Sequence, residues 1–105
     1  MVNDILTASG VQYRRSRFPR PPSGTYAVYM DDVEGYGPDN MPARIFTHNV
    51  TIEVYEAEPG DAAAEAAIEA ELDAAGVEWT KQDRYWLQDV QRYQVVYEFT
   101  YTEKK

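Results

Sequence analysis

Large apolar and polar residues alternate along the last part of the chain. From Tyr93 to Tyr101 an apolar side chain stands at every odd position, with polar residues such as Gln94, Glu98 and Thr100 between them. Successive side chains of a β-strand point to opposite faces, so this spacing predicts a half-buried strand over about 92–102. A strand-like run over about 77–88 comes just before it. Residues 88–91 are a link of hairpin length, so the two runs are expected to pair.

The first half of the chain holds two more candidate strands. Residues 26–30 form a compact run of β-branched and aromatic side chains, which favour strands. A second run over 44–56 has its apolar residues on one parity: Phe46, Val50, Ile52 and Val54. It is expected to pair with the first run. The stretch 31–43 between them is rich in Gly, Pro, Asp and Asn, and it predicts a long loop.

One helix is indicated in the middle of the chain, where alanines follow Asp61 and continue to Gly76. Asp61 is suited to cap its start, and Gly76 is suited to end it. The expected buried stripe of this helix is Ala64, Ile68, Leu72 and Ala75. A short N-terminal helix is expected over residues 2–8. The stretch 11–24 contains three prolines and predicts an extended arm or loop.

These elements define the expected fold class. The 105 residues predict a single α+β domain, because the chain is long enough for one core and too short for two. The sheet is expected to be mostly antiparallel and four-stranded. The alanine-rich helix would pack on one of its faces, next to the short N-terminal helix.

Composition limits the classes of partner that the chain can bind. The formal net charge is −8 at pH 7, which disfavours binding to phosphate backbones and to anionic lipid surfaces. Neither membrane binding nor direct sequence-specific recognition of nucleic acid is therefore expected. The chain has no cysteine, which excludes disulfides, thiolate catalysis and cysteine-ligated zinc. No run approaches the ~18 apolar residues of a membrane span and no signal pattern is present, so a soluble, unexported protein is expected.

The charge is unevenly distributed. Residues 11–20 carry four basic side chains and no acid: Arg14, Arg15, Arg17 and Arg20. The predicted central helix carries acids at every fourth position: Asp61, Glu65, Glu69 and Asp73. Opposite patches attract and orient each other, so these eight residues form a candidate subunit interface, with the acidic 31–39 stretch as a second possible acceptor. The alternative is that both charged segments are solvated surface.

Candidate chemistry is sparse. His48 is the one histidine, and its strand position favours a packed or edge side chain. A Ser-His-acid site would need Ser9, Ser16 or Ser23, which lie in segments expected to be too flexible to hold a nucleophile. The acids Asp31, Asp32, Glu34 and Asp39 could surround a hard cation, but their spacing does not match an EF-hand. We expect no enzyme activity, cofactor or metal. Four large aromatic residues are expected to lean toward solvent: Tyr29, Tyr36, Tyr55 and Trp86.

Several segments of the chain, in this order and spacing, resemble a known family: 25–30, 37–40, 50–55, 72–77 and 93–99. They resemble the small tail-completion, or tail-terminator, proteins of long-tailed bacteriophages and prophages, which are similar in role to the tail terminator of phage lambda. The resemblance covers about residues 18–101. The arginine-rich segment at 14–20 is a departure from the family pattern.

The resemblance implies that the chain is a structural protein of a virion. It implies a ring, commonly of six subunits, that caps the tail tube and presents a surface to the head connector. The implied partners are other copies of the chain, the tail tube protein and the head–tail connector protein. The ring would form on the tube or before it, in the virion and in the host cytoplasm during assembly. The alternatives are another head–tail joining or minor tail protein, and a small ligand- or metal-binding domain that uses the 31–43 loop.

Overall fold

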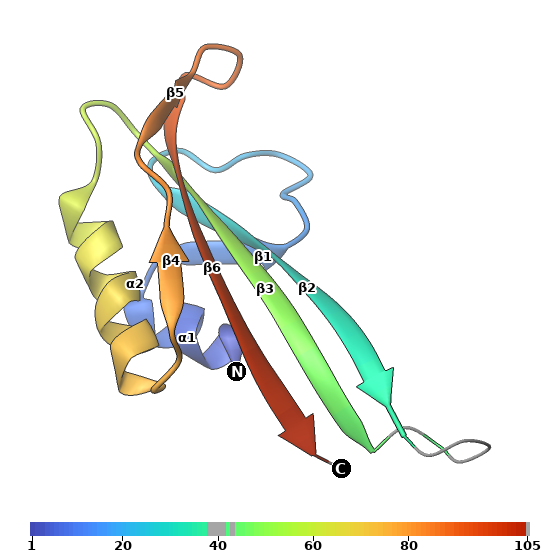
Figure 1. Ribbon diagram of the computed structural model, residues 1–105. Coiled ribbons are helices and arrows are strands. Elements are labelled where there is room, and N and C mark those ends of the chain that lie inside the picture. The colour runs from blue at the N-terminus through green and yellow to red at the C-terminus, as the bar shows by residue number, and fades with distance from the viewer. Residues whose placement is uncertain (38–41, 43, 105) are drawn as a thin grey trace.

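The computed structural model describes residues 1–37, 42 and 44–104, and these contain a sheet of six strands: β1 (Gln12–Arg15), β2 (Tyr26–Tyr36), β3 (Ile45–Glu56), β4 (Trp79–Lys81), β5 (Tyr85–Leu87) and β6 (Arg92–Lys104). The order across the sheet is β1-β2-β3-β6-β4, and β5 also pairs with β6 (Figure 1). All neighbours are antiparallel except β1 and β2, which are parallel. The three long strands β2, β3 and β6 form the centre.

Two helices cover one face of this sheet (Figure 1). Helix α1 (Val2–Ser9) ends at Gly10, whose φ of 78° is a left-handed conformation that favours glycine. Helix α2 (Ala62–Ala74) begins after Asp61, whose Oδ1 accepts a hydrogen bond of 3.0 Å from the backbone N–H of Ala64. Both predicted helices are confirmed, as is the cap at Asp61.

The core lies between the helices and the central strands. The strand register aligns Tyr29, Ile52 and Tyr97 in one row beneath the helices, and Leu6 and Ile68 close the core from above. The odd positions of β6 from Val95 to Phe99 are buried, as the alternation predicts. Each fully buried aliphatic side chain contributes about 1.5–3 kcal/mol, so these rows supply most of the stability.

Among the described residues, those that cover the opposite face of the sheet lie at one of its ends. There the segment after β1 folds back over β2, and Phe18 packs edge-on against Tyr26 with 5.4 Å between ring centroids. Tyr26 in turn stacks on Tyr55 at 5.1 Å. Val28, also on this face, is buried. The prolines of residues 11–24 therefore belong to a packed arm that contains strand β1.

Beyond the helices, the three long strands continue as a projection that we call the β-arm, residues 31–36, 45–49 and 100–104 (Figure 1). The molecule is accordingly elongated, with principal extents of 52 × 28 × 22 Å. Val33, Tyr36 and Ile45 are exposed large apolar side chains of the β-arm. The β-arm is therefore a part of the sheet that extends past the ends of α1 and α2 (Figure 1).

The sheet differs from the predicted one in two respects. It has six strands and is mixed, whereas four mostly antiparallel strands were expected. The added strand β1 arises because residues 12–15 pair in parallel with β2, a contact between segments that local patterns do not reveal. The expected strand over 77–88 is divided into β4 and β5, because Arg84 leaves the sheet edge and turns toward the start of α2.

The loop predicted over 31–43 is wrong for residues 31–36, which continue β2. Each of these residues has a partner on β3, so a continuous ladder overrides the local turn preference. Residues 38–41 and 43 lie outside the described residues. Tyr29 faces the core and is 6% exposed, so its expected solvent position is wrong, whereas Tyr36 is exposed. Ala75, expected to be buried, is exposed because α2 ends one residue earlier.

Candidate functional site: charged surfaces and a groove

The basic arm, residues 12–24, begins with edge strand β1 and is anchored to the fold at several points. The backbone N–H of Ser16 donates to the carbonyl of Tyr29 at 2.8 Å, and Ser16 has a φ of 68° that redirects the chain. The side chain of Gln12 donates to the carbonyls of Ser23 and Thr25, each at 3.3 Å. These contacts, with the packing of Phe18, fix the arm on the sheet edge.

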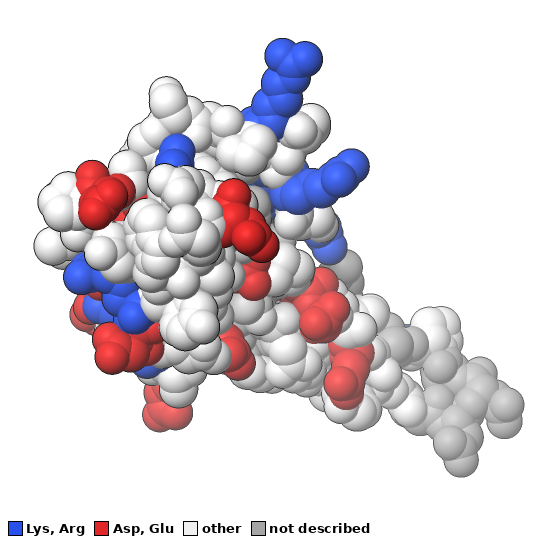
Figure 2. All heavy atoms as spheres, turned by 90° about the horizontal axis from the view of Figure 1, so that it is seen from above, with Lys and Arg blue, Asp and Glu red and all other residues white. Residues whose placement is uncertain are grey.

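The basic arm presents all four of its arginines to solvent: Arg14, Arg15, Arg17 and Arg20. None of them forms an ion pair within the described residues. The guanidinium of Arg14 lies over the ring of Phe18, 5.8 Å from its centroid. In Figure 2 acidic side chains lie on the surface toward the projecting end, whereas several basic side chains stand out from one side of the molecule. This surface is therefore a concentrated positive patch on an acidic protein.

The predicted acidic ridge on α2 is engaged within the chain. Asp61 caps the helix, and Asp73 accepts a hydrogen bond of 2.9 Å from the indole N–H of Trp79. Lys81 Nζ lies 2.8 Å from Glu65 Oε1 and 2.7 Å from Glu69 Oε2. The structure thus brings the ridge to β4, not to the basic arm of the same chain. That the ridge contacts a neighbouring subunit stays a prediction.

Glu65 of this ridge forms a buried carboxyl pair with Glu56. Glu56, at the end of β3, is 0% exposed, and Glu65 is 7% exposed. Arg84 Nε donates to Glu56 Oε1 at 3.0 Å, and Arg84 Nη2 donates to Glu65. The pKa of Glu56 is raised to about 7, mainly because the side chain is buried and secondly because Glu65 lies next to it. Burial opposes ionisation of Glu65 as well, but hydrogen bonds with Glu56, Lys81 and Arg84 outweigh it and lower its pKa to about 2.

Sequence reasoning missed this pair, although one signal was present. Glu56 lies on the same parity as Val50, Ile52 and Val54, so the alternation alone places it on the core side of β3. A buried acid requires a partner, and the partner, Arg84, is 28 residues away in the chain. The pair and its arginine fasten the strand end, α2 and the segment between β4 and β5 to one another.

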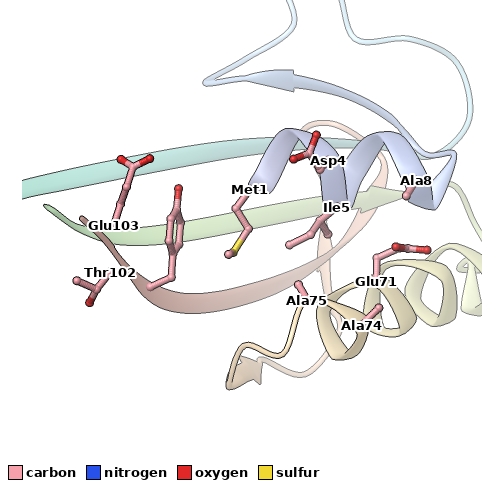
Figure 3. A pocket seen from close by; sticks show the side chains of 10 residues that line it. Met1, Asp4, Ile5, Ala8, Glu71, Ala74, Ala75, Thr102 and Glu103 are labelled. Atoms are coloured by element: carbon pink, nitrogen blue, oxygen red, sulfur yellow. The ribbon is translucent and has the colours of Figure 1, made fainter. Parts of the chain in front are cut away.

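A groove opens where the helices end and the β-arm begins (Figure 3). It has a volume of about 700 Å³ and lies between α1, α2 and the end of β6. Its lining is mostly apolar: Met1, Ile5, Ala8, Ala74, Ala75 and Tyr101, with Thr102 beside them. Three acidic side chains also line it: Asp4, Glu71 and Glu103. We call it the acid-rimmed groove.

His48 lies on the wall of the β-arm next to this groove. Its Nδ1 lies 3.0 Å from Asp31, and its Nε2 lies 3.2 Å from Glu103. Its ring stacks on Tyr101 at a centroid distance of 4.3 Å. The predicted packed histidine is confirmed, since His48 is 9% exposed. Its contacts therefore join β3 to β2 through Asp31 and to β6 through Glu103.

The other candidates for chemistry are dispersed or used structurally. Ser9 Oγ donates to the carbonyl of Leu6 at 2.7 Å at the end of α1. Of the acids proposed around a cation, Asp31 binds His48, Glu34 accepts from Tyr36 at 2.6 Å, and Asp39 lies outside the described residues. Among the residues that are described, no group of three or more His, Asp or Glu side chains is placed to hold a metal ion. No helix in the described part of the chain is both long and apolar enough to cross a membrane.

Comparison with known proteins gives a likeness of fold. No family profile matches the sequence, and no curated protein matches it. The chain is similar to a chain from the virion of a native gene transfer agent particle, with a TM-score of 0.63 and 20% identity over 96% of this chain and 84% of that one. A second solved protein, whose description states no function, has a TM-score of 0.64 and 10% identity over 98% of this chain and 86% of its own. At these identities the likeness establishes a shared fold.

Proposed function

We propose that this chain is a structural virion protein of a phage or prophage that caps the tail tube as an oligomeric ring. The observation that carries the proposal is the fold that the chain shares, over nearly its whole length, with a chain from a gene transfer agent virion. The resemblance of the sequence to tail-completion proteins agrees with it. Its partners would be other copies of itself, the tail tube protein and the head–tail connector.

The arrangement of surfaces supports an assembly role. A ring needs two unlike patches on each subunit, because its contacts run head to tail. The chain offers a basic arm on one sheet edge, whose arginines form no ion pair in the described part of the chain, and an acid-rimmed groove on the helical side. The projecting β-arm adds exposed apolar side chains, which suit burial against a partner. We propose that the chain acts by binding alone, without catalysis, in the virion and in the host cytoplasm during assembly.

The test is to mix the purified chain with tail tubes assembled from the tube protein of the same phage or prophage. Electron microscopy should show a ring at one end of each tube, and the tubes should stop growing. The mass of the free ring should be about six times the 12.0 kDa of one chain. Tubes that grow without limit and carry no cap would overturn the tail-capping role. Binding to the connector in the absence of tubes would favour another head–tail joining role.

A small ligand- or metal-binding domain would have used residues 31–43 as one loop. Residues 31–36 are instead a strand paired with β3.

A further inference from the structure

The arginines of the basic arm form no ion pair with any residue that the structure describes. Lys81 and Arg84 both bind acids of the same chain, whereas Arg14 and Arg17 bind none within the described residues. The arm is also shaped by packing, since Phe18 is held against Tyr26. A fixed, unpaired cationic segment is prepared for a partner, because little ordering is required when it binds.

The acid-rimmed groove has the complementary properties. Asp4 on α1 and Glu71 on α2 are acids with no ion-pair partner in the described part of the chain. They flank an apolar lining that includes Ile5 and Tyr101 (Figure 3). A groove of about 700 Å³ has room for several side chains, and its floor suits the aliphatic stems of arginines.

We propose that the acid-rimmed groove of one subunit receives the basic arm of the next copy of the chain. The inference rests on the proposed function, because it names the contact from which the ring would be built. A second copy is the occupant that the charges favour. The arginines lie on β1 and the segment that follows it, whereas Asp4 and Glu71 lie on α1 and α2. Such a pairing of unlike patches repeats from subunit to subunit.

The groove is a better acceptor than the acidic ridge on α2. The ridge carboxylates of Glu65 and Glu69 already bind Lys81, so a second cation would gain less from them. Asp4 and Glu71 have no ion-pair partner among the described residues, so their charge is available to a second copy. Exposed ion pairs are individually weak, so the acids would orient the arm while contact with the apolar lining supplies most of the affinity.

Cysteine cross-linking tests this contact cleanly, because the chain has no cysteine of its own. Arg17→Cys lies on the basic arm, and Ala74→Cys lies in the groove on an exposed position of α2. The two single variants are mixed at a concentration at which the natural chain is oligomeric, and then oxidised. Ala66→Cys is the matched control, since it is an exposed alanine of the same helix outside the groove.

The expected result is a disulfide-linked dimer from Arg17→Cys with Ala74→Cys, at least about tenfold more abundant than with Ala66→Cys, as proximity requires. A chain that carries both Arg17→Cys and Ala74→Cys should form a ladder of linked subunits. Equal yields with the control would overturn the contact, whether they are measured in solution or, for a chain that stays monomeric there, on tail tubes. That outcome leaves tube capping to be judged separately by microscopy, so the failure of this contact and the failure of the proposed function are distinguishable.

Discussion

Glu56 and Glu65 share one guanidinium, that of Arg84, across the junction between β3 and α2. Glu56 is fully buried and Glu65 nearly so, which makes simultaneous ionisation of both costly. One cation that is itself partly exposed does not remove this cost. The carboxyl pair therefore retains a proton to an unusually high pH.

This pair should make folding stability depend on pH. The pKa of Glu56 is raised from 4.5 to about 7, so its contribution is complete below pH 4.5 and is lost as the pH rises through about 7. The pKa of Glu65 is lowered to about 2, so its contribution is present above pH 4.5 and is lost as the pH falls through about 2. Chemical denaturation between pH 5 and pH 8 should show a loss on the order of 1–3 kcal/mol.

The Glu56→Gln variant should flatten this dependence. Glutamine keeps the shape and still accepts a hydrogen bond from Arg84, but it has no proton to lose. Its stability should therefore change little between pH 5 and pH 8 through this site. The control is Glu58→Gln, an exposed acid two residues away, which should keep the natural dependence. If Glu56→Gln and Glu58→Gln gave the same pH profile, the carboxyl pair would not be its source.

The two faces of β6 should differ in their tolerance of substitution. Tyr97 is fully buried, and Tyr97→Ala should cost about 3–5 kcal/mol through the lost burial and the cavity. Thr100 is exposed, and Thr100→Ala should cost no more than about 0.5 kcal/mol. Urea denaturation measures both. Similar costs at the two positions would contradict the facing of the strand.

The Tyr97→Phe variant measures what the hydroxyl of Tyr97 contributes to stability. It removes the 2.7 Å hydrogen bond that Tyr97 donates to Glu69 and leaves the ring in place. The expected cost is about 1–2 kcal/mol, because Glu69 keeps its contact with Lys81. Burial raises the pKa of Tyr97, so its phenol should stay neutral in alkaline solution as long as the chain is folded. Ultraviolet titration of the folded protein should show this delay.

The β-arm should depend on His48. This side chain joins Asp31 and Glu103 and stacks on Tyr101, so His48→Ala should loosen the projection while the helical core stays folded. Hydrogen exchange should show at least about tenfold faster exchange in residues 31–36, with little change near Tyr97. Thr47→Ala, on the other face of β3, is the control. Uniform acceleration across the whole chain would show that the β-arm is not a separate unit.

Charge reversal should weaken assembly. Arg14→Glu combined with Arg17→Glu should raise the dissociation constant of self-association by about tenfold or more, because two repulsive contacts replace two attractive ones. Adding Asp4→Lys and Glu71→Lys to the same chain should restore part of the affinity. Analytical ultracentrifugation measures the constants, and circular dichroism confirms that each variant is folded.

The same experiment compares the groove with the acidic ridge. Glu69→Lys with Asp73→Lys, placed in the arm-reversed chain, should give no rescue if the groove is the acceptor. Rescue by the ridge variants and not by the groove variants would assign the contact to the acidic ridge and reject the groove.

Local patterns in the sequence were sufficient for the main elements. The alternation in residues 93–101 predicted both the strand and its buried face, because a strand's period of two is a property of the backbone. Asp61 and Gly76 marked the start and the end of α2, since capping depends on residues close in the chain. The separation of the arginines at 14–20 from the acids was likewise visible from the order of the residues.

Tertiary structure decided the features that join distant segments. The extension of β2 to Tyr36 depends on a ladder with β3, and the strand pairing of residues 12–15 depends on β2. The contact of Glu56 with Arg84 and the groove between α1, α2 and β6 exist only when separate segments meet. Turn preference and charge are local quantities, whereas sheet register and ion pairing are set by what lies across the fold. For that reason the sequence by itself identified the acidic ridge as a candidate surface, and only the folded chain showed that its charge is largely used internally.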